Sequence, residues 1–205
     1  MTRIQLSPME FDALKEIGNI STGNAITSLS ILINKNVDMT VPESKFVPIS
    51  EFSNEVGGPE TVVSGIYLEL KGGVSGEALF LFPETGALEL VDIIMGREFG
   101  KKKEMDEMDI SAFKEMSNIL AGSFLTALSK MLNVKILPSI PHVATDMVQS
   151  LIDGVLAKIS FYAEEVFFVK TKINVAGHNI NGDFVVIFDK PSLELMVSVI
   201  HTNYG

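Results

Sequence analysis

Two segments of this chain, 7–42 and 106–141, carry the same polar residues in the same register, 99 positions apart. A hydrophobic core requires only apolar residues at recurring positions. A register that instead keeps glutamate, asparagine, glycine and proline predicts two equivalent surface sites. The residues in register are Asp12, Glu16, Asn19, Gly23 and Pro42 in the first segment, and Ser111, Glu115, Asn118, Gly122 and Pro141 in the second.

Each segment predicts one long helix, over about 8–33 and about 107–132. Ser7-Pro8-Met9-Glu10 is a typical helix start, because serine can cap, proline suits the first helical position and the glutamate completes a capping box. The corresponding start of the second segment is Asp106-Glu107-Met108-Asp109. The expected N-caps are Ser7 and Asp106, and the expected C-terminal ends are Asn34 and Asn133.

The two predicted helices have the same two faces. At about 100° per residue the motif residues fall within roughly a 60° arc, opposite to an apolar stripe. We therefore expect the motif to face away from the core in both helices. The apolar stripes are Phe11, Leu14, Ile17, Ala25 and Leu29 in the first, and Ile110, Phe113, Met116, Phe124 and Leu128 in the second.

The remaining sequence is rich in β-forming residues and does not alternate strands with helices, which favours an α+β fold. We expect a tandem duplication with pseudo-twofold symmetry, in which two long helices pack with one shared, largely antiparallel sheet. Residues 1–205 would form one domain of two repeats, about 7–100 and 106–205. The expected strands are Val62–Lys71, Gly76–Phe82, Leu156–Phe161, Val166–Val175 and Asp183–Phe188, with turns at Gly72-Gly73 and Gly177–Gly182, strand ends at Pro83 and Pro191, and short helices at Leu88–Met95 and Ser192–Ile200.

Composition excludes several classes of function. The chain has no cysteine, so it has no disulfide, thiolate metal site or cysteine nucleophile. Its net charge of −10 disfavours nonspecific binding to nucleic acid or to anionic lipid. No apolar run approaches the roughly 20 residues that span a bilayer. We therefore expect a cytoplasmic protein that binds neither nucleic acid nor membrane.

Residue patterns of self-contained enzymes are also missing from the sequence. The histidines, His142, His178 and His201, are scattered and lack metal-ligand spacing. There is no nucleophile elbow, Walker loop or dinucleotide fingerprint. An enzyme that acts alone on a small molecule therefore has little support.

The glutamate and asparagine of each motif lie one helical turn apart. A carboxamide donates and accepts hydrogen bonds but cannot act as a general base, although it can orient a water molecule. A carboxylate can pair with a lysine of a partner. Such a site would complete a reaction centre that the bound protein supplies. Gly23 and Gly122 leave room for an approaching surface, or alternatively for close packing of the two long helices against each other.

The doubled pattern D/S-x3-E-x2-N-x22-P resembles the CheC family of chemotaxis phosphatases, which includes CheX and the phosphatase domain of FliY. The resemblance implies hydrolysis of the aspartyl phosphate of the response regulator CheY, which itself holds Mg²⁺, so that this chain needs no cofactor. Glu16 and Glu115 would dock a lysine of CheY, and Asn19 and Asn118 would position the attacking water. Asp12 and Ser111 would have supporting roles, and Pro42 and Pro141 would shape the chain that enters the sheet.

Within that family, the presence of two motifs and no additional switch domain is most similar to CheC. The resemblance also implies a second partner, the deamidase CheD, which would stimulate the activity, and a monomer when the chain is alone. The segment Val143–Leu151 is a candidate CheD surface, because the corresponding part of the first half is rich in glycine and proline; a core helix is the alternative interpretation. A non-catalytic adaptor that binds CheY or CheD is the alternative function.

Overall fold

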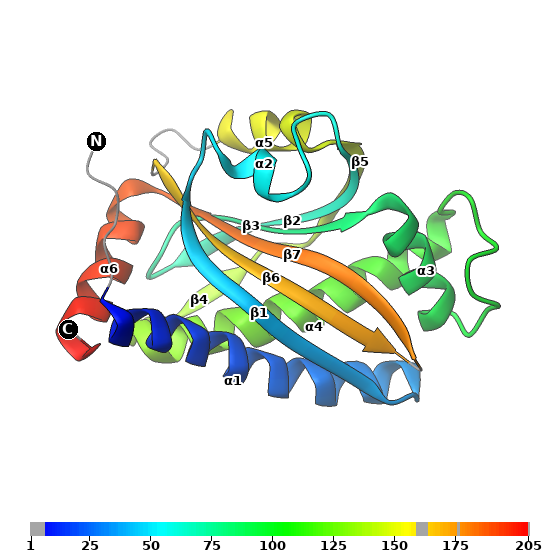
Figure 1. The fold of residues 1–205 in the computed structure, drawn as a ribbon, viewed down its shortest axis with the longest axis horizontal. Helices are drawn as coiled ribbons and strands as arrows, with labels where there is room; N and C mark the ends of the chain where they lie inside the picture. The colour runs from blue at the N-terminus through cyan, green and yellow to red at the C-terminus, as the bar shows by residue number, and fades with distance from the viewer. Residues whose placement is uncertain (1–6, 159–163, 176, 205) are drawn as a thin grey trace.

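Six helices and seven strands make up the part of the chain that the computed structural model describes, which is residues 7–158, 164–175 and 177–204 (Figure 1). Within the first helix, the side chains of Phe11, Leu14 and Ile17 lie outside the described part. The helices are α1 (Pro8–Ile33), α2 (Phe52–Glu55), α3 (Glu84–Ile94), α4 (Glu107–Leu132), α5 (Val148–Leu156) and α6 (Lys190–Tyr204). The strands are β1 (Val37–Pro48), β2 (Val62–Gly72), β3 (Gly76–Pro83), β4 (Ile136–Pro138), β5 (His142–Met147), β6 (Glu165–Val175) and β7 (His178–Phe188).

One antiparallel sheet contains strands from both halves of the chain, in the order β1-β6-β7-β3-β2-β4, with β5 also paired to β2. β1 of the first half pairs with β6 of the second, and β4 and β5 of the second half pair with β2 of the first. The predicted α+β class and the shared antiparallel sheet are therefore confirmed.

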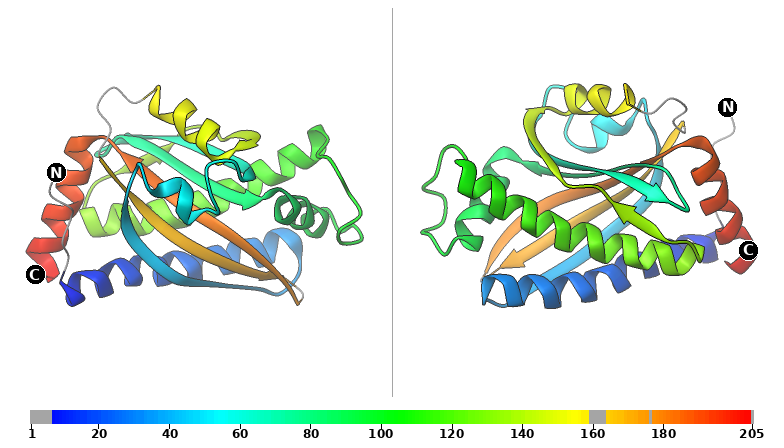
Figure 2. Two further views of the ribbon diagram at one scale, coloured as in Figure 1. Left: turned by 45° about the horizontal axis from the view of Figure 1, so that its top comes forward. Right: turned by 180° about the vertical axis from the view of Figure 1, so that it is seen from behind.

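The two faces of the sheet are covered by different helices. α1 and α4 contact each other and run side by side in opposite directions on one face, whereas α2 and α5 cover the other face (Figures 1 and 2). Because side chains alternate along a strand, each strand contributes to both layers. On β7, Phe184 and Val186 join the larger core under α1 and α4, and Val185 joins the smaller core under α2 and α5.

Both long helices have the predicted bounds and caps. Ser7 and Asp106 accept hydrogen bonds from the backbone of the first turn, and each forms a capping box with the acidic residue three positions on. Asn34 and Asn133 end the helices in the left-handed conformation, with φ of 50° and 52°. The apolar stripe of α4 is buried at Phe113, Met116, Phe124 and Leu128, and Ile110 is half-buried; the described part of the α1 stripe is buried at Ala25 and Leu29.

The two motif prolines lie where the strand pairing shifts by one residue. Pro42 falls in the irregularity between Thr40 and Glu43 of β1. Pro141 separates β4 from β5, where Ser139 N–H donates to the Glu69 carbonyl over 2.8 Å. A proline cannot donate to a strand ladder, so both are accommodated at such irregularities. Pro42 lies within β1 and not where the chain enters the sheet, so the role of these prolines in shaping the chain stays a prediction.

Several predicted elements were wrong or missed. Leu156 is the last residue of α5, and Ala157 and Lys158 form a turn rather than the predicted strand, whose residues 159–161 lie outside the described part. Pro191 lies inside α6 and does not end a strand. Because β7 already begins at His178, only Gly177 of the predicted turn over 177–182 lies in a turn. Strands β1, β4 and β5 and helix α2 were not predicted, because they are short, or polar and irregular, and lack a clear period. The alternative interpretation of Val143–Leu151 as a core helix is correct from Val148 onward, where α5 begins, and wrong for the residues before it, which form β5.

Candidate functional site

The first motif lies on the exposed side of α1. Asp12, Glu16 and Asn19 are all solvent-exposed, and so is Gly23 two turns from Glu16. Because α1 buries its other side against α4 and the sheet, the carboxylate and the carboxamide are presented together to solvent. This face can therefore be approached by a macromolecule.

The second motif has the same placement on α4. Ser111, Glu115 and Asn118 are exposed, and Gly122 is half-buried. The predicted orientation, with each motif away from the core, is thus confirmed on both helices. Each motif is thus placed on its own helix, the first on α1 and the second on α4.

Neither motif glycine is required for packing within the fold. Among the described residues, a Cβ built at Gly23 or at Gly122 would meet no atom within 4 Å outside its own helix. The long helices do contact each other, but not through these glycines. The interpretation of the glycines as helix–helix contacts is therefore wrong. Gly23 is exposed, and Gly122 is half-buried beside a hollow between α4 and β4. Glycine in a helix costs about 1 kcal/mol relative to alanine, so these positions carry a cost that the fold does not explain.

Two further hydrogen bonds recur at matching positions. Thr27 Oγ1 donates to the Gly23 carbonyl over 3.1 Å, and Thr126 Oγ1 donates to the Gly122 carbonyl over 2.6 Å. Hydroxyl groups one turn further on also connect each helix to the strand that follows. Ser30 Oγ accepts from Val37 N–H over 3.3 Å, and Ser129 Oγ accepts from Ile136 N–H over 3.2 Å. Sequence reasoning missed these residues, although their spacing of 99 positions was the available signal.

The first turn of α4 is held by a charged network that fixes the start of the second motif. Lys102 Nζ lies 2.6 Å from Asp106, and this hydrogen bond together with one from the Asp109 backbone lowers the pKa of Asp106 to about 2. Burial alone would raise the pKa of Asp109, but hydrogen bonds from Lys102, the Asp106 backbone and Arg97 lower it. These contacts keep the buried Asp109 ionised and anchor the helix to the chain after α3.

The first turn of α1 is held by a contact between Glu10 and His201 instead of a network with lysine and arginine. Glu10 is buried, accepts a hydrogen bond from Ser7 N–H over 2.5 Å and contacts Nδ1 of His201 in α6. The pKa of Glu10 is lowered, chiefly by the hydrogen bond from the Ser7 backbone. Each long helix is thus anchored through the third residue of its first turn, Glu10 or Asp109.

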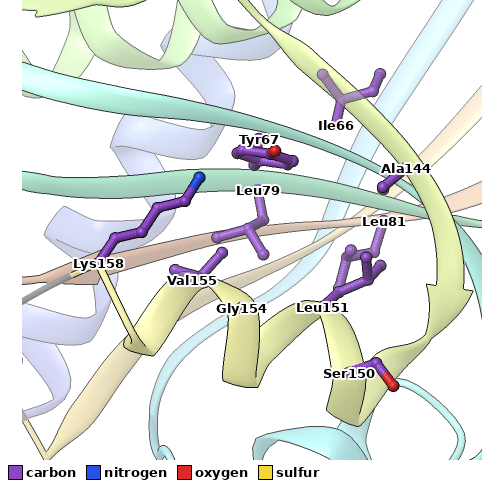
Figure 3. Close-up of a pocket in the computed structure, with 11 residues that line it drawn as sticks. Ile66, Tyr67, Leu79, Leu81, Ala144, Ser150, Leu151, Gly154, Val155 and Lys158 are labelled. Carbon is purple, nitrogen blue, oxygen red and sulfur yellow. The ribbon is translucent and has the colours of Figure 1, made fainter.

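A cavity of about 200 Å³ lies on the opposite face of the sheet, between α5 and strands β2 and β3 (Figure 3). Tyr67, Leu79 and Val155 contribute to its largely apolar lining, and Lys158 Nζ lies 4.4 Å from the centroid of the Tyr67 ring. Gly65 lets α5 approach β2, because a Cβ there would come within 2.8 Å of Leu151. No motif residue lines this cavity.

A second, wider hollow of about 540 Å³ opens beside Gly122, between α4 and β4, and includes Lys130 and Lys135. The described residues contain no cluster of three or more acidic or histidine side chains that could hold a metal ion. Among the same residues, no helix combines the length and the hydropathy needed to cross a membrane.

Comparison with known proteins decides the family. Residues 9–45, which contain the first motif, match the model of the CheC-like family, and residues 64–152 match that of the chemotaxis phosphatase CheX. The chain is 32% identical over 171 residues to the CheY-P phosphatase CheC of Bacillus subtilis (strain 168), and the match covers 82% of each protein. The chain belongs to the CheC-like family.

Two further relatives extend the likeness of this CheC-like chain. The flagellar motor switch phosphatase FliY of B. subtilis (strain 168) is 34% identical over 166 residues, which cover 76% of this chain but only 43% of FliY. The crystal structure of FliY from Thermotoga maritima has the same fold, with a TM-score of 0.73, 23% identity and coverage of 97% and 99% of the two chains. The family resemblance read from the motifs is therefore confirmed.

Proposed function

We propose that this CheC-like chain is a protein phosphatase that hydrolyses the aspartyl phosphate of the response regulator CheY. One observation carries the proposal: an exposed glutamate, an exposed asparagine and an unobstructed glycine follow one another on the outer face of both α1 and α4. The named activity of the CheC relative supports it.

In the proposed mechanism, the partner supplies the reacting phosphoryl group and its Mg²⁺, and this chain supplies no cofactor. Glu16 and Glu115 pair with a lysine of CheY and fix its orientation. Asn19 and Asn118 then enter the CheY active site, where the carboxamide holds a water molecule in line with the phosphorus–oxygen bond that breaks. An amide suits this role because it donates and accepts hydrogen bonds without titrating. Asp12 and Ser111 support the docked pose.

We also infer that the chain is a tandem duplication with pseudo-twofold symmetry, folded as one domain. Supporting observations are the equal length of α1 and α4, 26 residues each, and their matching caps and serine contacts. The strand order β1-β6-β7-β3-β2-β4 also reads the same from both ends once each strand is replaced by its counterpart. The proposal thus includes two equivalent active sites in a cytoplasmic monomer.

Decay of CheY labelled by acetyl phosphate tests the activity. Wild type is compared with Glu16→Ala/Asn19→Ala, with Glu115→Ala/Asn118→Ala and with the combined variant. We expect each double variant to retain part of the acceleration and the combined variant to have none. All four positions are exposed, so each change should alter the free energy of unfolding by under about 0.5 kcal/mol. A wild type that does not accelerate decay, with or without CheD, would leave the non-catalytic adaptor as the better interpretation.

A second proposed partner is CheD, which would bind this chain and stimulate hydrolysis. The candidate segment Val143–Leu151 spans most of β5 and the first turn of α5, at an edge of the sheet beside β2 (Figure 2). Asp146 is exposed there, and its carboxylate accepts a hydrogen bond from Met147 N–H over 2.7 Å. Asp146→Lys is expected to weaken CheD affinity, measured by titration calorimetry; unchanged affinity would remove this surface from consideration.

A further inference from the structure

Two methionines at matching positions of the long helices are largely exposed. The relative exposure of the residue is 62% for Met9 in α1 and 70% for Met108 in α4. A single exposed apolar side chain requires no explanation. The same long apolar side chain is exposed at the start of both helices, 99 positions apart. This recurrence indicates a shared role. Both residues lie outside the motif that defines the family resemblance.

The methionines share the face of the motif. With about 100° and 1.5 Å per residue, Met9 lies about 20° around the helix from Glu16 and about 10 Å along its axis. The same arithmetic relates Met108 to Glu115. From Met9 to Gly23 the strip is about 21 Å long. One partner's share of a standard protein interface, about 800 Å², is roughly 28 Å across, so a strip of this length fits within it.

An apolar residue also follows each motif asparagine. Ile20 is 44% exposed, and its counterpart Ile119 is partly buried. On α1, therefore, Met9, Glu16, Ile20 and Gly23 form one exposed strip, whereas on α4 Met108 and Glu115 are exposed and Ile119 and Gly122 are half-buried. The apolar part of this strip is larger on α1 than on α4.

We propose that Met9 and Met108 are docking residues that set the affinity of the two sites for the response regulator, an inference that rests on the proposed function. An exposed carboxylate–ammonium pair contributes little to binding, so Glu16 and Glu115 orient the partner more than they hold it. A flexible, polarisable methionine can pack on an apolar patch of the partner next to the paired lysine. Exclusion of water from that contact would supply affinity that the polar pair lacks.

Steady-state hydrolysis of phosphorylated CheY, with one site silenced, separates affinity from chemistry. In an Asn118→Ala background only the site on α1 remains, and Met9→Gln is compared there with Met9→Leu. Met9→Gln is expected to raise KM about fivefold with kcat unchanged, which is the usual size for the loss of one buried apolar contact at an interface. Met9→Leu should restore most of the affinity. The mirror experiment places Met108→Gln in an Asn19→Ala background.

Ile140→Gln is the matched control, because Ile140 is 79% exposed but lies between β4 and β5 rather than on either long helix. It should leave KM unchanged. Equal effects of Met9→Gln and Ile140→Gln on KM, or no effect of either methionine variant, would overturn the docking role. A fall in kcat alone would also contradict it.

Affinity for CheY activated with beryllofluoride distinguishes failure of this inference from failure of the proposed function. If wild type binds activated CheY without hydrolysing phosphorylated CheY, the phosphatase fails but the methionine variants must still lower affinity. If wild type hydrolyses and the variants bind as tightly as wild type, the methionines are excluded and the phosphatase stands. No binding by wild type would overturn both.

Discussion

The glutamate and asparagine of each motif act, in the proposed mechanism, by position rather than by acid–base chemistry. Both asparagines are exposed, so none of the residues that the structure describes covers them. A carboxamide alone cannot cleave a phosphate. In the proposed mechanism the metal ion and the reacting phosphoryl group therefore come from the bound regulator. The activity at each site would depend on what the bound regulator supplies.

The motif glycines give a prediction that separates fold from function. Gly23→Ala and Gly122→Ala should each stabilise the protein by up to about 1 kcal/mol, because the added methyl meets no neighbour and alanine favours a helix. Gly23→Leu together with Gly122→Leu should also fold, yet slow the decay of phosphorylated CheY at least tenfold by blocking its approach. Urea unfolding and phosphate decay measure the two effects. Loss of stability in the leucine variant would instead assign the glycines to packing.

Asp183 of β7 predicts a pH dependence of stability. Burial raises the pKa of this carboxyl from 3.8 to about 6, and the Lys170 ammonium only partly offsets it. Because folding raises the pKa of Asp183, its protonated form stabilises the native state relative to the unfolded state. The contribution of Asp183 to the free energy of unfolding should therefore decline as pH rises from about 4 to about 6. Asp183→Asn should therefore stabilise the protein at pH 8 by about 1–3 kcal/mol. Urea unfolding at pH 4 and 8 tests this, with the exposed Asp38→Asn as control.

At the scale of secondary-structure elements, a single residue ends each long helix. Asn34 and Asn133 both adopt positive φ, which asparagine and glycine tolerate better than other residues. Each turn then leads directly to the serine contact that starts the next strand, so the ends of α1 and α4 also set where β1 and β4 begin.

Substitution at these ends should have a graded effect. Asn133→Gly is expected to leave the free energy of unfolding nearly unchanged, whereas Asn133→Ala should lower it by about 1 kcal/mol because a Cβ is strained in the left-handed region. The exposed Asn179→Ala in β7, where φ is negative, serves as a comparison. Thermal unfolding followed by circular dichroism gives the values. Equal losses for glycine and alanine would point to a lost side-chain contact instead of backbone strain.

At the scale of the molecule, the two halves depend on each other for their sheet. β1 pairs with β6 of the other half, and β4 and β5 of the second half pair with β2 of the first. Neither half alone could therefore satisfy the hydrogen bonds of its strands or cover the large core shared by α1 and α4.

Fragments should consequently complement each other. Residues 1–102 and 103–205, expressed separately, are expected to lack cooperative unfolding, and the mixture should regain it together with phosphatase activity. Circular dichroism and size-exclusion chromatography follow the recovery. Cooperative unfolding of either fragment by itself would show that the halves are independent units.

Much of this structure was predictable where a period or a cap repeats in the sequence. The bounds of α1 and α4, their capping residues and the outward orientation of Glu16 and Asn19 follow from local rules that operate over one or two turns. The strands β1, β4 and β5 were missed, because each lies at an edge or beside an irregularity and has no clean alternation. Arg97 was missed as well, since its carboxylate partners come from two different helices.

The sequence by itself determined the two motifs, the helices that carry them and the family, because these depend on spacing along one chain. Only the tertiary structure decided that the motif glycines are not packed against the other helix, and that strands of the two halves interleave. Those outcomes depend on which surfaces meet after collapse, and contacts between residues a hundred positions apart are set by the packing of the entire core, not by any local pattern.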